Sequence, residues 1–165
     1  MKTRALIKPV LSILLLAVLF SCKKEDEYTI ENKPVTGNVT YTQTGAVPLE
    51  VDPVTQQPLK MRFSFSGSGN ISDFGDLTLE SSFTFDFVAG QGYDFVTTYT
   101  GASASDSFSS NGTSQMIGNM VFTITESFTE GKGKFKKIKG GGEIHVELVP
   151  DGSSGTGEVS WTATY

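Results

Sequence analysis

The chain has 165 residues, with 13 lysines and arginines against 18 aspartates and glutamates, and a formal net charge of −5. This acidic balance excludes a general nucleic-acid-binding protein, because neutralising phosphates requires a net basic face. The 18 glycines and 12 phenylalanines, with abundant serine and threonine and no long run of helix formers after residue 22, predict an all-β protein.

The N-terminal segment has the three-part pattern of an export signal. Residues 1–8 are basic, residues 10–20 are apolar apart from one serine, and residues 19–22 read Leu-Phe-Ser-Cys. The apolar run is too short to cross a membrane, which takes about 20 residues. The segment resembles a bacterial lipoprotein signal with its lipobox, and the resemblance implies cleavage before Cys22 and acylation of Cys22. The alternative is an ordinary secretory signal with a coincidental cysteine.

Cys22 is the only cysteine of the chain, so an exported protein could form no internal disulfide, and lipidation would give the lone thiol a role. The acyl chains would make the membrane its partner, and we expect a cell-envelope protein of the outer membrane. Residues 23–27, Lys-Lys-Glu-Asp-Glu, resemble the export signal of surface-exposed lipoproteins in some Gram-negative bacteria, although a plain tether is the alternative.

Three parts are therefore expected along the chain. They are a signal peptide over residues 1–21, an acylated cysteine with a flexible acidic tether over residues 22–36, and one folded domain over residues 37–165. Cleavage would remove three of the 13 cations and none of the 18 acids, leaving 10 against 18 and a net charge of −8. A mature chain of this length suits a single domain with its own core.

Alternation of apolar and polar residues predicts about eight strands after the tether. They cover residues 38–44, 59–65, 77–87, 93–100, 103–114, 119–129, 143–149 and 159–165. Glycine-rich turns separate many of them, so successive strands should pair antiparallel. We predict an all-β fold, a single antiparallel eight-stranded barrel, because closure removes exposed edges and encloses one apolar face. An open sandwich is the alternative.

Two glycine-containing segments resemble signatures of the allene oxide cyclase-like barrels, a calycin-like family whose bacterial members are mostly uncharacterised. Residues 67–75 read Gly-Ser-Gly-Asn-Ile-Ser-Asp-Phe-Gly, and residues 131–140 read Gly-Lys-Gly-Lys-Phe-Lys-Lys-Ile-Lys-Gly. The resemblance covers residues 59–165 and implies the barrel fold, but Lys136, Lys137 and Lys139 replace the usual small residues after Phe135. None of the catalytic residues of the plant enzyme can be placed on this sequence, so activity does not follow.

Glu126 is the first candidate site residue. Strict alternation puts it on the same face as Phe122, Ile124 and Phe128, so it would point into the barrel. A buried carboxyl group is costly unless paired and holds its proton more tightly, and Glu126 could anchor a polar ligand or act as an acid near the barrel mouth. We expect instead that a bulge or the strand end lets Glu126 reach water. Ser81 is a second polar residue on an otherwise apolar inward face, and burying a hydroxyl group costs less than burying a carboxyl group.

The basic run of residues 132–139 contains five lysines, Lys132, Lys134, Lys136, Lys137 and Lys139. It could contact anionic lipid headgroups or an acidic glycan. The expected arrangement is a solvated hairpin.

Glu143, His145 and Glu147 alternate along one strand face, at spacings of roughly 7 Å. These residue types could bind a ligand or a metal. Residues on one strand rarely converge on a single ion without outside ligands, and the chain has no other histidine. We therefore expect a solvent-facing stripe, no metal and no cofactor.

The sequence favours a binding or structural module on a lipid anchor, with an apolar small molecule or a glycan as candidate ligand. One alternative is an isomerase-like or cyclase-like enzyme that acts on an apolar molecule at the barrel mouth. Another is a small integral outer-membrane barrel, since Tyr165 gives the aromatic C-terminus that such barrels often have. Several predicted strands are shorter than the roughly 9–11 residues that a spanning strand needs.

Overall fold

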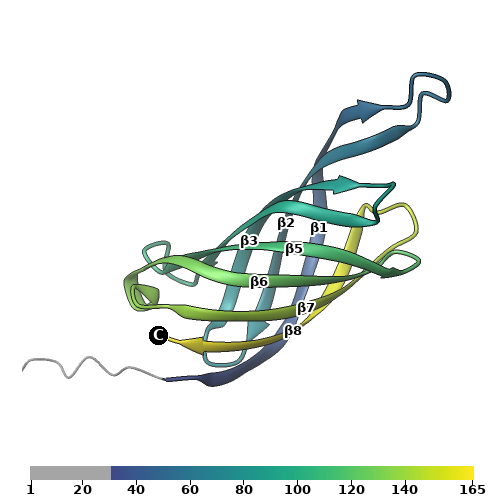
Figure 1. Cartoon of the computed structure of the whole chain (residues 1–165). Helices are drawn as coiled ribbons and strands as arrows, with labels where there is room; N and C mark the ends of the chain where they lie inside the picture. The colour runs from purple at the N-terminus through teal and green to yellow at the C-terminus, as the bar shows by residue number, and fades with distance from the viewer. Residues whose placement is uncertain (1–30) are drawn as a thin grey trace, which may run out of the picture.

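The computed structural model describes residues 31–165, and these form eight strands and one 3₁₀ turn (Figure 1). The strands are β1 (Lys33–Val51), β2 (Pro58–Ile71), β3 (Gly75–Asp86), β4 (Gln91–Gly101), β5 (Ser107–Gly118), β6 (Val121–Lys132), β7 (Lys139–Leu148) and β8 (Ser154–Thr164), and the turn η1 spans Gly133–Phe135. All eight predicted strands are present. β1 begins before residue 37, where the sequence placed the start of the domain.

The strands close into a single antiparallel barrel. Each strand pairs with the next along the chain, and β1 also pairs with β8, from Lys33 opposite Ala163 to Thr42 opposite Ser154. The predicted barrel is confirmed and the open sandwich is excluded, because the β1–β8 ladder joins the two edges that a sandwich would leave free. Within residues 31–165 no helix is long and apolar enough to cross a membrane.

The two ends of the barrel differ. β1 starts and β8 finishes at one end, which we call the closed end, where the 3₁₀ turn η1 also lies. Phe135 of this turn is fully buried and packs edge-on against Phe74 and Phe108, with centroid distances of 5.1 and 4.9 Å. Lys134 Nζ donates a hydrogen bond of 2.9 Å to the Phe74 carbonyl oxygen. The turn therefore plugs this end with aromatic side chains.

The other end, which we call the open end, carries the hairpin turns that follow β1, β3, β5 and β7. After Gln43, whose N–H donates to the Ser153 carbonyl, β1 pairs only with β2. The β1–β2 hairpin therefore projects past the rim of the barrel as a two-stranded arm (Figure 1).

Two aromatic residues are more exposed than alternation predicts. Alternation along residues 77–87 and 93–100 puts Phe87 and Tyr93 on the inward face with Phe85 and Phe95, yet Phe87 is 45% and Tyr93 is 38% exposed. The strand register shifts between Ser82 and Thr84 in the β3–β4 pair and between Gly92 and Phe95 in the β4–β5 pair. In both pairs the extra residue is on β4, so the bulge reverses the faces of β4 and turns Tyr93 outward. β3 pairs with β2 without a shift and keeps Phe85 buried. Phe87 follows the end of β3, so it lies at the rim, where it contacts Phe63 and Phe85.

Candidate functional site

The aromatic side chains of the interior form two separate clusters. The closed-end cluster contains Phe74, Tyr99, Phe108, Phe128, Phe135, Trp161 and Tyr165. The open-end cluster contains Tyr41, Phe63, Phe65, Phe83, Phe85, Phe87, Phe95 and Phe122. The interior-facing residues of β3 to β6 that lie between the clusters include polar ones, namely Ser81, Thr97, Ser110, Ser114 and Glu126, all of them buried. The barrel therefore has a polar layer between two apolar halves.

An apolar cavity occupies the open half. Its outer part has a volume of about 240 Å³ and lies between the rim turns and the phenylalanines of β2, β3 and β6. A narrow inner part of about 40 Å³ continues toward the polar layer. Phe65, Phe83, Phe122 and Leu148 line both parts, so the two parts are adjacent and lie in line between the rim and the polar layer.

Ser81 and Ser114 are the two serines among the residues that line the inner cavity, whose surface is almost wholly apolar. Ser81 Oγ accepts a hydrogen bond of 3.1 Å from Thr97 Oγ1. Ser114 is 5% exposed, and its Oγ has no hydrogen-bond partner in the described part of the chain. Tyr41 lines the same space from β1. A buried hydroxyl without a partner is uncommon and costs free energy, so Ser114 is an unfilled hydrogen-bonding position in the wall of the cavity.

Glu126 lies in the polar layer with only 2% of its surface exposed. The Tyr99 hydroxyl donates to its carboxyl group, at 2.8 Å from Oε2 and 3.1 Å from Oε1. Burial raises the pKa of Glu126 to about 7, against smaller lowering effects from Tyr99, Ser110 and Thr97. The expectation that a bulge or the strand end lets Glu126 reach water is wrong. β6 pairs with β7 without a register shift and with β5 in register from residue 122 to 128, so Glu126 keeps its inward direction.

The charge of Glu126 affects the pKa values of two buried tyrosines. Burial raises the pKa of Tyr41 and of Tyr99 well above the usual value for a phenol, and the nearby Glu126 carboxylate adds to both increases. Glu126 does not line either part of the cavity. The carboxyl group therefore lies behind the cavity wall. It influences the cavity only through its charge, which acts on the Tyr41 hydroxyl. Ser81 also points inward and is buried, as alternation suggested.

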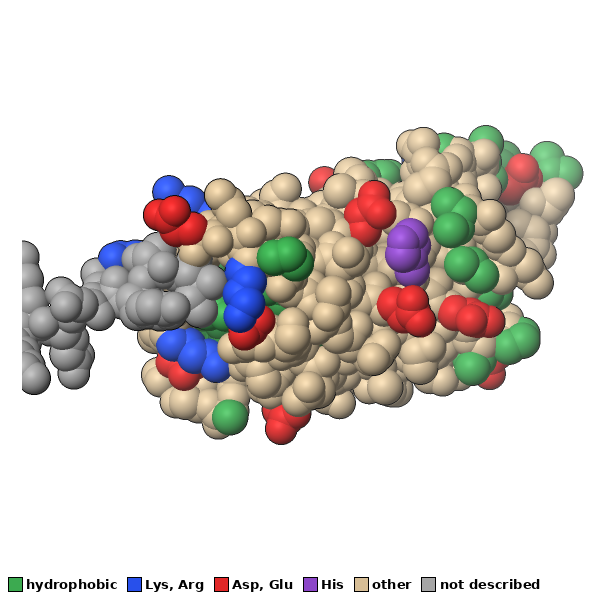
Figure 2. Space-filling view, turned by 90° about the horizontal axis from the view of Figure 1, so that it is seen from below, with side chains coloured by type: hydrophobic (Ala, Val, Ile, Leu, Met, Phe, Trp, Pro, Cys, Tyr) green, Lys and Arg blue, Asp and Glu red, His purple; other side chains and the backbone are tan. Residues whose placement is uncertain are grey.

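Glu143, His145 and Glu147 form the expected solvent-facing stripe on β7, and Figure 2 shows the histidine beside acidic side chains on the outer surface. His145 Nε2 lies 3.8 Å from Glu143 Oε2, and His145 Nδ1 lies 3.1 Å from Thr123 Oγ1. No cluster of three or more potential metal ligands occurs among residues 31–165. The stripe faces away from the cavity and does not take part in it.

The basic run lies at the closed end, where Figure 2 shows Lys and Arg side chains near the start of β1. Lys134 has a structural task, since it bonds to Phe74 and its Nζ stands 4.8 Å from the centre of the Phe135 ring. The remaining lysines of the run are exposed. The run therefore surrounds the aromatic plug, on the opposite end of the molecule from the cavity.

The rim of the open end is apolar on its outside as well. The large hydrophobic residues that are exposed within residues 31–165 lie on the arm or around the open-end turns, except Val96, which lies midway along β4. They are Val47, Leu49, Val51, Val54, Phe87, Val88, Tyr93, Val96, Met116, Ile117 and Val149. Figure 2 shows this gathering of hydrophobic side chains at the end away from the start of β1.

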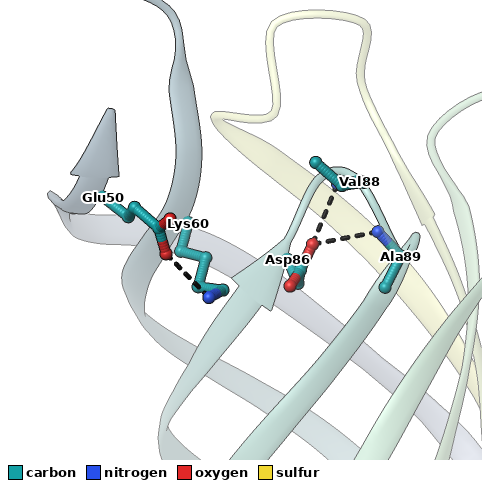
Figure 3. Close-up of polar contacts among 5 residues, drawn as sticks. All are labelled: Glu50, Lys60, Asp86, Val88 and Ala89. Carbon is teal, nitrogen blue, oxygen red and sulfur yellow. Dashed lines mark hydrogen bonds and ion pairs between the residues drawn. The ribbon is translucent and has the colours of Figure 1, made fainter. Parts of the chain in front are cut away.

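Aspartates hold three of the four open-end turns. Asp86 Oδ1 accepts hydrogen bonds of 2.9 Å from the N–H groups of Val88 and Ala89 (Figure 3). Asp52 does the same for two N–H groups of the arm, and Asp151 for one in the last hairpin. Figure 3 also shows the Lys60–Glu50 ion pair, at 2.7 Å, which links the two strands of the arm. These contacts fix the turns that frame the cavity.

Ser114 was not singled out from the sequence, although a signal for it exists. Phe108 is the one large apolar residue of the serine-rich segment 103–114, and steps of two residues from it reach Ser110 and Ser114. Cys22, the proposed lipidation site, lies outside the described residues. Comparisons with family models, with curated proteins and with solved structures found no match to this chain.

Proposed function

We propose that the protein is a cell-envelope lipoprotein, anchored through acyl chains on Cys22, whose barrel binds a small apolar molecule through its open end. The observation that carries the proposal is the apolar cavity of the open half, whose outer part at the rim adjoins an inner part beside the polar layer. A concave, mostly apolar pocket with a few polar groups is the usual form of a small-molecule site. The apolar rim supports the proposal, because an apolar ligand can pass along it before entering the cavity.

The size of the cavity limits the ligand. Its outer part of about 240 Å³ is slightly below the roughly 300 Å³ at which ordinary ligand pockets begin, and the inner part is narrower still. The cavity suits a slender molecule or one end of a longer chain, and a bulky polycyclic compound would not fit. Below the polar layer the interior is filled by the closed-end cluster, so the ligand enters and leaves at the same end.

A pair of neighbouring substitutions tests ligand binding. Leu148→Trp would fill the cavity, since Leu148 lines both of its parts, whereas Val149→Trp adds the same side chain at an exposed rim position. A neutral dye that fluoresces in apolar surroundings should bind the wild-type protein and the Val149→Trp variant, and should lose its binding in Leu148→Trp. Equal binding by both variants would place the dye elsewhere and contradict the proposal.

The anchor needs its own experiment. Mass spectrometry of the membrane fraction should detect an acylated N-terminal peptide beginning at Cys22, and a Cys22→Ala variant should leave the membrane fraction. Absence of a lipid-modified Cys22 peptide from membranes that contain the protein would remove the anchoring half of the proposal and leave the cavity unaffected.

The two alternatives receive less support. An enzyme acting at the barrel mouth with Glu126 as its acid would need that carboxyl group in the cavity wall, and it lies behind it. The strands have 10 to 19 residues, so strand length is no argument against an integral membrane barrel. Its outer surface should however be apolar, and here the apolar side chains of the strands face inward while the outward positions are mainly threonine, serine and charged residues.

A further inference from the structure

We infer that the ligand carries one uncharged hydrogen-bonding group, a hydroxyl or a carbonyl, at the end that enters first, and that Ser114 recognises it. The inference rests on the proposed function and adds the chemical class and the orientation of the ligand. An unbranched alcohol, aldehyde or ketone is the simplest molecule of this class.

Ser114 is the residue that the inference depends on. Ser114 is 5% exposed and lines the inner cavity, and its hydroxyl group is buried with no hydrogen-bond partner within residues 31–165. It lies opposite Gly92 in the β4–β5 pair, where a Cβ atom on Gly92 would collide with Ser114 Oγ. The missing side chain at Gly92 therefore leaves room for this hydroxyl, and a ligand donor or acceptor beside it would complete an otherwise missing hydrogen bond.

Ser81 can contribute a second hydrogen bond to the ligand, as a donor. Its Oγ accepts from Thr97, so its own hydroxyl hydrogen is available to donate into the inner cavity that Ser81 lines. Ser81 and Ser114 lie on β3 and β5, on either side of β4. They are the aliphatic hydroxyl groups of the inner cavity, and the other side chains around it are aromatic or aliphatic.

The charges around the cavity favour a neutral group over an anion. Neither part of the cavity is lined by a lysine, an arginine or a histidine. Behind its wall lies Glu126, whose carboxylate form already disfavours a second negative charge on Tyr41. A ligand carboxylate would therefore lose its hydration without gaining a counter-ion, which is strongly unfavourable. A hydroxyl or carbonyl loses less and regains a hydrogen bond.

The aromatic walls explain why the rest of the ligand should be apolar. Phe65 and Phe83 stack with a centroid distance of 6.0 Å and an interplanar angle of 3°, and Phe83 stacks on Phe95 at 5.1 Å. These rings border the inner cavity, and Phe65 and Phe83 extend along its outer part. The ligand's apolar body would lie between them and the rim, with its polar end inward.

Calorimetric titration with n-octane, n-octanol and octanoate tests the inference on the full mature chain. Ser114→Ala should weaken n-octanol binding about fivefold, the size expected for one hydrogen bond, and change n-octane binding less than about twofold. Ser110→Ala is the matched control, because Ser110 is on the same strand and equally buried, but it faces Glu126 and lines neither part of the cavity. It should leave the affinities of both ligands unchanged.

Octanoate should bind the wild-type protein at least tenfold more weakly than n-octanol near neutral pH. Failure of all three molecules to bind would overturn the proposed function and this inference with it. Binding of n-octane and n-octanol with no selective effect of Ser114→Ala would overturn the inference and leave the proposed function standing, as would octanoate binding as tightly as n-octanol. Thermal unfolding of both serine variants confirms that the comparison is made between folded proteins.

Discussion

The closed and open halves of the barrel both have aromatic interiors, but one interior is filled and the other contains a cavity. In the closed half, Phe74, Phe108 and Phe135 are at most 2% exposed and contact one another directly, so the space is filled. In the open half, phenylalanines such as Phe65 and Phe83 border a cavity. The difference shows that aromatic content alone does not decide whether a barrel interior is a core or a binding site.

What separates the halves is the added plug. The segment that contains η1 inserts Phe135 and Ile138 between the strand ends of the closed half, whereas the open half ends in tight turns that insert no side chain of that kind. The free energy of burial is concentrated where the plug lies, and the open half keeps space for a ligand. Four pairs of variants test this contrast between the halves.

The largest effect is expected for Phe135→Ala. Removing a fully buried ring that packs against Phe74 and Phe108 should lower the free energy of unfolding by about 3–5 kcal/mol. Phe87→Ala, which removes the same side chain from a 45% exposed position at the rim, should cost about 1 kcal/mol. Urea denaturation measures both values. Equal losses would mean that the closed end is not the more stable half.

The next effect concerns Glu126 and pH. The pKa of Glu126 is 4.5 in a solvated state and about 7 in the fold, so the folded state binds the proton more tightly and stability falls as pH rises between these values. The loss should reach about 3 kcal/mol above pH 7. Glu126→Gln removes the titrating group while keeping a partner for Tyr99, and it should flatten this part of the stability profile.

Urea midpoints measured across this pH range compare Glu126→Gln with the wild-type protein. Glu147→Gln is the control, because Glu147 is exposed on the outer surface, and its profile should follow that of the wild-type protein. A wild-type profile that rises through this range relative to Glu126→Gln would contradict the burial of a carboxyl group with a raised pKa.

A smaller effect is expected for Gly141→Ala, at the closed-end part of β7. Gly141 has a φ of 148°, and a Cβ atom there would collide with the Glu126 backbone oxygen. The substitution should cost about 2 kcal/mol or more. Gly45→Ala, on the arm, would place its Cβ 3.7 Å from Ser64 Cβ, an ordinary contact, and should be close to neutral. Thermal unfolding distinguishes the two.

The smallest effect is expected for Asp86→Ala at an open-end turn. The variant loses the carboxylate that accepts from the N–H groups of Val88 and Ala89, which should cost about 1 kcal/mol. Asp86→Asn keeps an acceptor oxygen and should recover most of the loss. Hydrogen exchange at these two amides reports on the turn directly, and unchanged exchange in Asp86→Ala would show that the side chain does not hold it.

Alternation along the chain predicted most inward positions correctly, including the inward direction of Glu126, and it failed at identifiable places. Tyr93 lies beyond the bulge on β4, and a bulge depends on how two strands pair, which one strand's sequence does not contain. Phe87 lies just past the end of β3, and alternation does not give the residue at which a strand ends. The expectation that Glu126 would reach water failed for the opposite reason, because the strands around it pair regularly.

The sequence by itself determined the all-β barrel and the number of strands, since these depend on periodicity and composition along the chain, and it predicts an export signal before Cys22. Only the tertiary structure decided which end of the barrel is filled, that Ser81 and Ser114 border one cavity, and that Glu126 lies behind its wall. The reason is physical: a period of two residues fixes the face on which a side chain lies, whereas the depth of that side chain and its neighbours depend on strand register and on the turns that close each end.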